Sequence, residues 1–261
     1  MKKFALITGA SSGIGLAYSK RLAELHYNLL LVSNQQQQLD DLAAEISERY
    51  GVQTATLFID LARETAAQEV FDFCNSNDFE IEILINNAGM FFFKPMYDVD
   101  IKRVSAMLYL HVVTPALLCK LFGGQMQKRQ SGHILNMSSM AAWMKLPTIS
   151  IYGPTKAFMR NFSLAIREEF FDDNVKVLAV CPGAVATGLY NLSEKYQKLG
   201  IKLGIIIQPE KLAKKAINQL FKGKKQYIAG GFINYLAIFF THRLPHFLTQ
   251  IIWRKIRKWT K

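Results

Sequence analysis

Ser139, Tyr152 and Lys156 are the residues whose types and spacing most directly indicate chemistry. Tyr152 and Lys156 are four positions apart, so any helix that contains both places them side by side on one face. A tyrosine hydroxyl has a pKa of about 10, which is too high for efficient proton transfer at neutral pH, and a neighbouring ammonium group lowers it by favouring the phenolate. Ser139 directly follows an apolar run typical of a strand. The three residues therefore predict general acid–base chemistry at a strand end.

This pattern has a simpler alternative. Tyr and Lys at this spacing occur together by chance, and the two could form an exposed helical pair. Ser138 is a second candidate by residue type, but its distance from Tyr152 along the chain is one residue longer than that of Ser139. The weight of the prediction therefore depends on other motifs at the same edge of the fold.

A glycine-rich turn supplies the first of those motifs: Thr8-Gly9-Ala10-Ser11-Ser12-Gly13-Ile14-Gly15 follows the first apolar run. Glycines permit a tight turn and let backbone N–H groups approach a pyrophosphate, which the N-terminus of the following helix stabilises. A strand–helix turn that binds no ligand has the same appearance. The turn indicates a dinucleotide site if a strand precedes it and a helix follows.

The elements that must position these residues alternate regularly along the chain. Short apolar runs at residues 4–8, 29–33, 54–59, 83–86, 133–138, 175–181 and 226–229 predict buried strands, and the stretches between them carry apolar residues at helical spacing. Such alternation predicts a parallel sheet with helices on both faces. We expect one doubly wound α/β domain over residues 1–261, with ligands at the carboxyl ends of seven strands.

Composition supports a globular, reduced chain. Half of the 261 residues are hydrophobic, which is enough for a sizeable core. The start of the chain resembles a first strand rather than a signal peptide. Cys74, Cys119 and Cys181 are odd in number and not at a metal-ligand spacing, so we expect free thiols, no metal site and a cytoplasmic location.

The motifs together resemble the short-chain dehydrogenase/reductase family. The turn has the form TGxxxGIG, and Asp60-Leu61, Asn86-Asn87-Ala88-Gly89, the Ser139/Tyr152/Lys156 set and Pro182-Gly183 with Thr187 follow in the family's order, each near a strand end. The match covers residues 1–230. It implies a Rossmann fold and an enzyme in which Tyr152 donates a proton to a carbonyl, Ser139 hydrogen-bonds the same oxygen, Lys156 binds the nicotinamide ribose and the cofactor supplies the hydride.

The resemblance also implies the residues that would contact the cofactor. They are Thr8, Gly9, Ser11, Ser12, Gly13, Ile14, Gly15, Ser33, Asn34, Asp60, Leu61, Asn87, Ala88, Gly89, Tyr152, Lys156, Pro182, Gly183, Val185 and Thr187. NAD-selective enzymes place a carboxylate at the end of the second strand, where it would repel a 2′-phosphate. Ser33 and Asn34 stand there instead, without the family's phosphate-binding arginine. We therefore expect NADP(H), with NAD(H) as the alternative.

His111 is a departure from the family pattern. It stands twenty-eight residues ahead of Ser139, where the family usually carries an asparagine that holds a proton-relay water for the lysine. Imidazole can both donate and accept, so His111 could replace the amide in that relay. It could equally be a core histidine bonded to a backbone carbonyl, or the relay could be impaired. The relay hypothesis predicts that His111→Asn retains or improves turnover.

The substrate region is expected to be apolar. The resemblance implies that residues 188–208 form the substrate loop. Residues 90–93 and Met140, Trp143, Met144 and Leu146 are expected to approach the same cleft. Such a pocket favours a bulky lipid-like ketone, such as a 3-oxoacyl thioester, a steroid or a keto-sphingoid base, over a sugar. Several of these residues could instead belong to the core or to a subunit contact.

The last fifth of the chain carries the excess positive charge, and its end, residues 230–261, has the pattern of a basic amphipathic extension. The net charge is +12, and residues 211–261 hold twelve Lys/Arg and no acidic residue. After Pro245, apolar and basic residues interleave as in an amphipathic helix on an anionic membrane face. Alternatives are a helix packed over the pocket or a partner subunit, or recognition of CoA phosphates or an acyl carrier protein. Nucleic acid is not an expected partner, because no nucleic-acid-binding fold accompanies the charge.

The C-terminal sequence has a recognisable order: Gln208-Pro209-Glu210-Lys211-Leu212-Ala213, a basic helix, a Gly-Gly turn, and Leu-Pro before the last amphipathic stretch. In this order it resembles the branch that contains long-chain 3-oxoacyl reductases and 17β-hydroxysteroid dehydrogenases. The leading hypothesis is an NADP(H)-dependent reductase of a bulky hydrophobic ketone, which family habit makes a homodimer or homotetramer through helices at 101–129 and around Tyr152. The alternative is a non-catalytic NADP(H)-binding sensor or a membrane-surface assembly protein. A location at the inner face of a membrane would suit a basic amphipathic tail.

Overall fold

The computed structural model describes residues 2–188, 199–202, 205–242 and 245–259. Its centre is a seven-stranded sheet in the order β3-β2-β1-β4-β5-β6-β9, in which every pair is parallel. The strands are β1 (Lys2–Thr8), β2 (Asn28–Ser33), β3 (Thr54–Phe58), β4 (Phe79–Asn86), β5 (Gly132–Met137), β6 (Val175–Pro182) and β9 (Gln226–Ala229). The predicted doubly wound α/β fold with seven parallel strands is confirmed.

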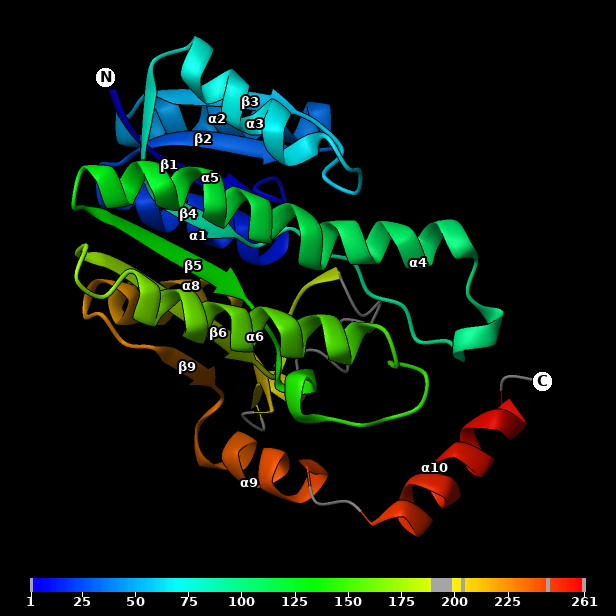
Figure 1. Ribbon diagram of the computed structural model, residues 1–261. Coiled ribbons are helices and arrows are strands. Elements are labelled where there is room, and N and C mark those ends of the chain that lie inside the picture. Colours follow the sequence, from blue (N-terminus) through cyan, green and yellow to red (C-terminus); the bar gives the residue numbers. More distant parts are fainter. Residues whose placement is uncertain (1, 189–198, 203–204, 243–244, 260–261) are drawn as a thin grey trace.

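Helices cover both faces of the sheet. On one face lie α1 (Gly13–Glu24), α2 (Gln36–Tyr50) and α8 (Pro209–Phe221), whose buried residues form one hydrophobic cluster with the sheet. On the other lie α3 (Ala66–Ser76), α5 (Thr114–Lys128) and α6 (Tyr152–Glu169), which share a second cluster. Figure 1 shows α5 and α6 in front of the sheet and α1 and α8 behind it. Because both faces are covered, the central strands are apolar on both sides rather than alternating.

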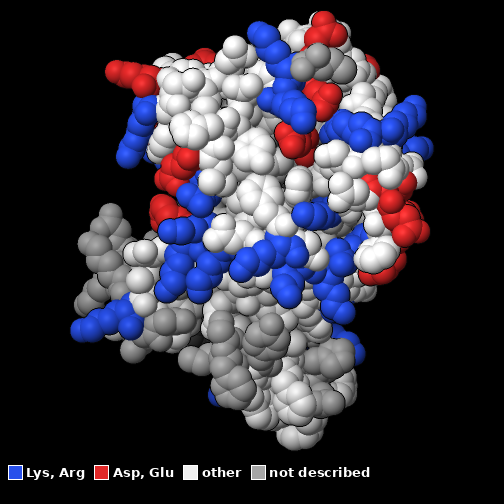
Figure 2. Space-filling view, turned by 90° about the vertical axis from the view of Figure 1, so that its left-hand side faces the viewer, with Lys and Arg blue, Asp and Glu red and all other residues white. Residues whose placement is uncertain are grey.

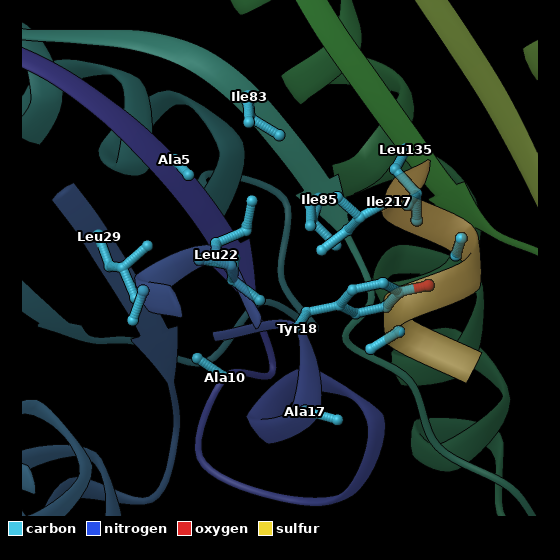
Figure 3. Close-up of a cluster of buried hydrophobic side chains, with 14 of the residues drawn as sticks. Ala5, Ala10, Ala17, Tyr18, Leu22, Leu29, Ile83, Ile85, Leu135 and Ile217 are labelled. Carbon is cyan, nitrogen blue, oxygen red and sulfur yellow. The ribbon is translucent and has the colours of Figure 1, made fainter. Parts of the chain in front are cut away.

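Tyr18 shows how tightly α1 packs beneath the site. Its side chain is fully buried and reaches from α1 toward Ile85, Leu135 and Ile217 (Figure 3). The hydroxyl donates to the Met137 Sδ atom at 3.3 Å. Burial raises the pKa of this phenol, so it stays protonated and acts as packing rather than as an acid. The glycine-rich turn that leads into α1 is therefore held on a rigid base.

The connectivity creates a crevice where the strand order reverses. The chain builds the sheet outward from β1 through β2 to β3, and then returns to β4 on the other side of β1. The connections after β1 and β4 thus leave in opposite directions, which opens a space at the carboxyl ends of these strands. Thr8 ends β1 and Asn86 ends β4, so the predicted motifs flank this crevice.

A long helical run crosses the front of the sheet. α4 (Ile101–Leu108) continues through a π-helical turn (Tyr109–Val113) into α5. Among the described residues, 101–128 is the stretch long and apolar enough to cross a bilayer, with a mean hydropathy of 1.6. Met107, Leu118, Phe122 and Met126 are buried in the hydrophobic clusters, which is how a core helix of this composition packs.

The remaining elements lie at the edges. Short 3-10 turns occupy Met96–Asp98 and Met140–Trp143, and a small parallel pair joins β7 (Ala184–Val185) to β8 (Ile206–Ile207). The chain ends in α9 (Gly231–His242) and α10 (His246–Trp259), which lie beyond the β9 side of the sheet (Figure 1). The predicted amphipathic helix after Pro245 is α10, whereas α9 was not predicted as a helix.

Candidate active site

One cavity of about 640 Å³ at the carboxyl ends of the strands contains most of the predicted site. Ser139, Tyr152, Lys156 and His111 all line it. The predicted cofactor residues that line it are Gly9, Ser11, Ser12, Gly13, Ile14, Ser33, Asn34, Asp60, Leu61, Asn87, Ala88, Gly89, Tyr152, Lys156, Pro182, Gly183, Val185 and Thr187. Thr8 and Gly15 do not line it and lie behind the turn. The structure therefore brings motifs from six strand ends to one place.

The glycine-rich turn is built for close backbone approach. Gly9 and Gly13 have positive φ angles of 64° and 53°, which side-chain-bearing residues rarely adopt. A Cβ on Gly15 would lie 1.9 Å from the Gly9 carbonyl oxygen, so only glycine fits there. α1 starts at Gly13 and points its free N–H groups at the cavity, which is the arrangement that binds a pyrophosphate.

Thr8 and Asn87 hold this turn against the end of β4. The Thr8 hydroxyl donates to the Ile85 carbonyl at 3.2 Å and accepts from the N–H groups of Asn87 and Ala88 at 2.9 and 3.0 Å. The Asn87 amide donates in return to the carbonyls of Thr8 and Gly9. These bonds satisfy the buried backbone groups of both loops and fix the width of the cavity between them.

Uncharged polar groups surround the end of β2. The Ser11 hydroxyl lies 2.8 Å from that of Ser33 and donates to the Gln35 side chain at 2.9 Å, while Asn34 lines the cavity beside them. Asp60, on the neighbouring β3 end, accepts from the Ala62 N–H at 2.9 Å. Gln35 was not among the predicted site residues, although its place directly after Asn34 could have indicated it. Ser33, Asn34 and Gln35, at the end of β2, carry no carboxylate.

Tyr152 and Lys156 lie on the first turns of α6, as their spacing predicted. Tyr152 is the first residue of α6, and the Lys156 Nζ atom lies 5.7 Å from the centre of its ring. Nζ donates to the Met137 carbonyl at 3.1 Å. Burial lowers the pKa of Lys156 to about 8, so the amine is close to its titration point yet mostly charged at neutral pH.

The two serines after β5 have different surroundings. Ser139 begins the 3-10 turn Met140–Trp143, and its oxygen accepts from the Ala141 N–H at 3.1 Å, which leaves its hydroxyl proton for another acceptor. Ser138 instead donates to the Lys156 backbone carbonyl at 2.7 Å. Ser138 therefore braces α6 against β5, while Ser139 fits the role of an oxygen-binding donor.

His111 lies on the π-helical turn with both ring nitrogens engaged. Nε2 accepts from the Met90 N–H at 3.0 Å, and Nδ1 lies 3.1 Å from the Thr155 hydroxyl. Thr155 donates in turn to the Tyr152 carbonyl at 2.8 Å. Burial and the nearby Lys156 cation hold the pKa of His111 well below its usual range. The histidine is thus bonded to a backbone N–H, not to the carbonyl that one of the sequence hypotheses expected.

The substrate side is only partly as expected. Met90 lines the cavity, and Phe91 meets the Tyr152 ring edge-on at 5.0 Å. Trp143, Met144 and Leu146 line a second cavity of about 1,190 Å³ on the outer side of α6, facing α9 and α10. Of the predicted substrate loop 188–208, residues 189–198 and 203–204 lie outside the described residues.

The crevice and the glycine-rich turn have the arrangement of a dinucleotide-binding fold, and the Ser139/Tyr152/Lys156 set lines the same cavity. The sequence model of the short chain dehydrogenase family matches residues 3–198. The chain belongs to the short-chain dehydrogenase family, as its motifs indicated.

Curated proteins match most of the chain at moderate identity. It is 32% identical to the very-long-chain 3-oxoacyl-CoA reductase of Anas platyrhynchos over 197 residues, which are 73% of this chain and 62% of that protein. The chain therefore spans less than two thirds of that relative's length.

Two solved structures superpose on most of the chain. A short-chain dehydrogenase from Sphingobium yanoikuyae in complex with NADPH has a TM-score of 0.80 at 27% identity, and covers 91% of this chain and 92% of its own. A 7β-hydroxysteroid dehydrogenase has a TM-score of 0.84 at 26% identity, and covers 93% of this chain and 92% of its own. Both similarities extend well beyond residue 198, into the C-terminal part of the chain.

Proposed function

We propose that this protein is an NADP(H)-dependent reductase of a bulky hydrophobic ketone, with Tyr152 as the proton donor. The observation that carries the proposal is the convergence of Ser139, Tyr152 and Lys156 on the same cavity as the glycine-rich turn. Acid–base groups and a dinucleotide cradle in one crevice suit a reaction that moves a hydride and a proton to one carbonyl.

The residues of this chain would divide the work as follows. The Tyr152 hydroxyl gives its proton to the carbonyl oxygen, and the Ser139 hydroxyl donates a hydrogen bond to the same oxygen to fix its position. The Lys156 ammonium group stabilises the phenolate that remains. The cofactor, when bound, supplies the hydride. Gly9, Gly13 and the N-terminus of α1 would hold its pyrophosphate.

NADP(H) is supported over NAD(H) by the end of β2. Ser11, Ser33 and Gln35 offer hydroxyl and amide groups, and Asn34 stands where a carboxylate would repel a 2′-phosphate. The similar Sphingobium yanoikuyae structure holds NADPH. Position 34 holds no arginine or lysine, so the 2′-phosphate would be bound only by hydrogen bonds and helix N-termini. We therefore expect a modest preference for NADP(H) over NAD(H).

An apolar substrate is supported by the hydrophobic cluster in which Tyr152 lies. Phe92, Met107, Ala141 and Ile151 form a hydrophobic cluster with Tyr152, and Met90 and Phe91 pack against it. The names of the two relatives, a 3-oxoacyl-CoA reductase and a hydroxysteroid dehydrogenase, point to the same substrate class. A 3-oxoacyl thioester or a steroid-like ketone is therefore the expected substrate.

The test is NADPH oxidation with a long-chain 3-oxoacyl thioester, a keto-steroid and a keto-sugar. Each buried CH₂ contributes about 0.8 kcal/mol, so kcat/KM for the apolar ketones should exceed that for the sugar by about 100-fold or more. Each substrate is also run with NADH, which should be about tenfold less effective. Equal or faster turnover of the keto-sugar would contradict the substrate class, and preference for NADH would contradict the cofactor.

Several features of the whole protein belong to the same proposal. Residues 1–261 would form one domain, with 188–208 as the substrate loop. Exposed apolar residues on the front helices, among them Leu117 and Phe158, support a homodimer or homotetramer through α5 and α6. The three cysteines are buried and free, which suits a cytoplasmic location. Membrane contact by residues 245–261 would place the protein at the inner face of that membrane.

A further inference from the structure

Exposed apolar side chains gather on the two C-terminal helices. Leu236, Phe239 and Phe240 stand at i, i+3 and i+4 of α9 and are all exposed. On α10, Phe247 and Ile251 are exposed at i and i+4. Residues three and four apart share one helix face, so α9 presents an apolar stripe to solvent. Its sequence carries no charged residue between Gly231 and Thr241. A water-facing helix without charges indicates a surface that is covered in use.

Exposed basic residues lie next to this apolar end of the chain. Arg254, Lys255 and Arg257 are exposed on α10, and Lys222, Lys224 and Lys225 are exposed between α8 and β9. Figure 2 shows Lys and Arg gathered in a band across one face, just above the end of the molecule where α9 lies. Above the band, acidic and basic residues are mixed. Exposed lysine and arginine residues therefore accompany the apolar side chains, and the sequence from position 211 onward contains no Asp or Glu.

We infer that the exposed face of α9 and α10 docks on an anionic lipid bilayer. Phenylalanine and leucine side chains would enter the acyl boundary while lysine and arginine reach the headgroups, as in interfacial amphipathic helices. A second copy of this chain is a poorer occupant, because a two-fold contact would bring the exposed Arg254, Lys255 and Arg257 of one α10 close to those of the other. The inference extends residues 245–261 to α9 and does not depend on the proposed reaction.

The first test is partition of the full chain onto vesicles. We expect binding to phosphatidylcholine vesicles that contain phosphatidylglycerol, with weaker binding to phosphatidylcholine alone and loss at high salt. Phe240→Ser should weaken binding about tenfold. Phe171→Ser is the matched control, because Phe171 is 66% exposed and Phe240 65%, and Phe171 lies in the turn between α6 and β6.

The basic residues of α10 are tested by charge removal. The double change Arg254→Gln and Lys255→Gln should weaken vesicle binding about 30-fold, whereas the control double change Lys120→Gln and Lys128→Gln should have little effect.

A second measurement reports the location directly. The native cysteines are buried, and burial raises the pKa of Cys74 and Cys119 to about 12, so a thiol dye should react with a newly exposed cysteine. A dye placed through Phe240→Cys should shift to the blue on anionic vesicles, whereas one placed through Phe171→Cys should not. Three results would overturn the inference: no preference for anionic vesicles, equal effects at both positions, or a change in oligomer mass by Phe240→Ser without a change in partition.

A second inference is carried by His111. A backbone N–H can only donate, so the His111 Nε2 atom that accepts from Met90 must be unprotonated, and the neutral ring carries its proton on Nδ1. That proton points to the Thr155 oxygen, whose own proton goes to the Tyr152 carbonyl. The tautomer is therefore set by its partners.

The geometry points to His111 as a positioning residue that ties the loop after Gly89 to the start of α6. The bonds to Met90 and Thr155 leave neither ring nitrogen for Lys156, so a proton relay through the imidazole is not supported. A Cβ on Gly89 would lie 3.1 Å from Nε2, which shows how closely the loop approaches the ring. This role rests on the proposed function, since the residue positioned is Tyr152.

Two substitutions separate the two bonds. In His111→Gln the amide can reach the Nε2 position and keep the Met90 contact, whereas in His111→Asn it reaches only the Nδ1 position and keeps the Thr155 contact. We expect faster hydrogen exchange of the Met90 amide in His111→Asn than in His111→Gln, and kcat lowered about tenfold by His111→Ala with KM little changed.

Nitrogen NMR of the wild type, with and without NADPH, provides a readout independent of activity. It should show the neutral Nδ1–H tautomer throughout the neutral pH range, and the pH profile of kcat should keep its shape in all three variants. A titrating or Nε2–H imidazole, or a pH profile altered by His111→Ala alone, would overturn the inference. If no ketone were reduced, the proposed function would be contradicted, but the tautomer assigned to His111 would not be affected.

Discussion

Tyr152→Phe should lower kcat for ketone reduction by about 1,000-fold while the Kd for NADPH changes by no more than about twofold, because a positioned general acid is worth about 10²–10⁴-fold. The substitution removes the hydroxyl and keeps the ring. The ring contacts that hold Tyr152 in place, edge-on with Phe91 at 5.0 Å and with His111 at 5.7 Å, do not need the hydroxyl. Steady-state kinetics and NADPH fluorescence titration measure the two quantities separately.

Tyr50→Phe is the matched control, since it makes the same chemical change at the end of α2 and should leave kcat unaltered. A Tyr152→Phe enzyme that retained most of its kcat would remove the phenol from the mechanism. Loss of NADPH binding instead of kcat would assign Tyr152 to the cofactor rather than to proton transfer.

Gly15→Ala should destabilise the protein and weaken NADPH binding by distorting the glycine-rich turn. The added Cβ would meet the Gly9 carbonyl oxygen at 1.9 Å and the Asn87 amide at 2.7 Å, and the former is backbone held in the turn. Overpacking of this kind costs about 1–3 kcal/mol, and here the strain falls on the turn that would bind the pyrophosphate. We expect a free energy of unfolding lower by about 3 kcal/mol and a Kd for NADPH higher by about tenfold or more, measured by urea denaturation and fluorescence titration.

Gly124→Ala provides the opposite result in the same protein. Gly124 lies inside α5, and a Cβ there would meet no atom within 4 Å. Alanine is favoured over glycine in a helix by about 1 kcal/mol, so this variant should be slightly stabilised with unchanged NADPH binding. Equal effects of the two substitutions would show that the turn has no special need for glycine at position 15.

The sheet could be predicted because its strands are buried on both faces. Continuous apolar runs such as residues 29–33 stand out from their surroundings, and all seven predicted strands are present. β4 begins at Phe79, four residues earlier than predicted, because Phe79–Glu82 alternates apolar and acidic residues and is only partly buried. The start of a strand is hard to predict where only one face of the strand is buried, because no continuous apolar run marks it.

The convergence of the candidate site residues on one cavity could be predicted because most of them stand at strand ends, which parallel topology brings together. The hydrogen-bond partners of His111 could not be predicted. They depend on a π-helical turn and on a backbone N–H group, which every residue except proline carries and which the sequence therefore does not mark. Trp143, Met144 and Leu146 lie on the outer side of α6 rather than in the predicted cleft, because a 3-10 turn changes the direction of the chain after Ser139. The apolar stripe of α9 was missed because apolar residues all round a short segment resemble a buried strand.

Transfer of deuterium from NADPH labelled at both C4 positions to a long-chain 3-oxoacyl thioester tests the reductase assignment most directly. The account predicts one deuterium on the new carbinol carbon of the product, formed by the wild-type chain and nearly absent with Tyr152→Phe. An unlabelled alcohol, or no alcohol from any apolar ketone at saturating NADPH, would contradict it.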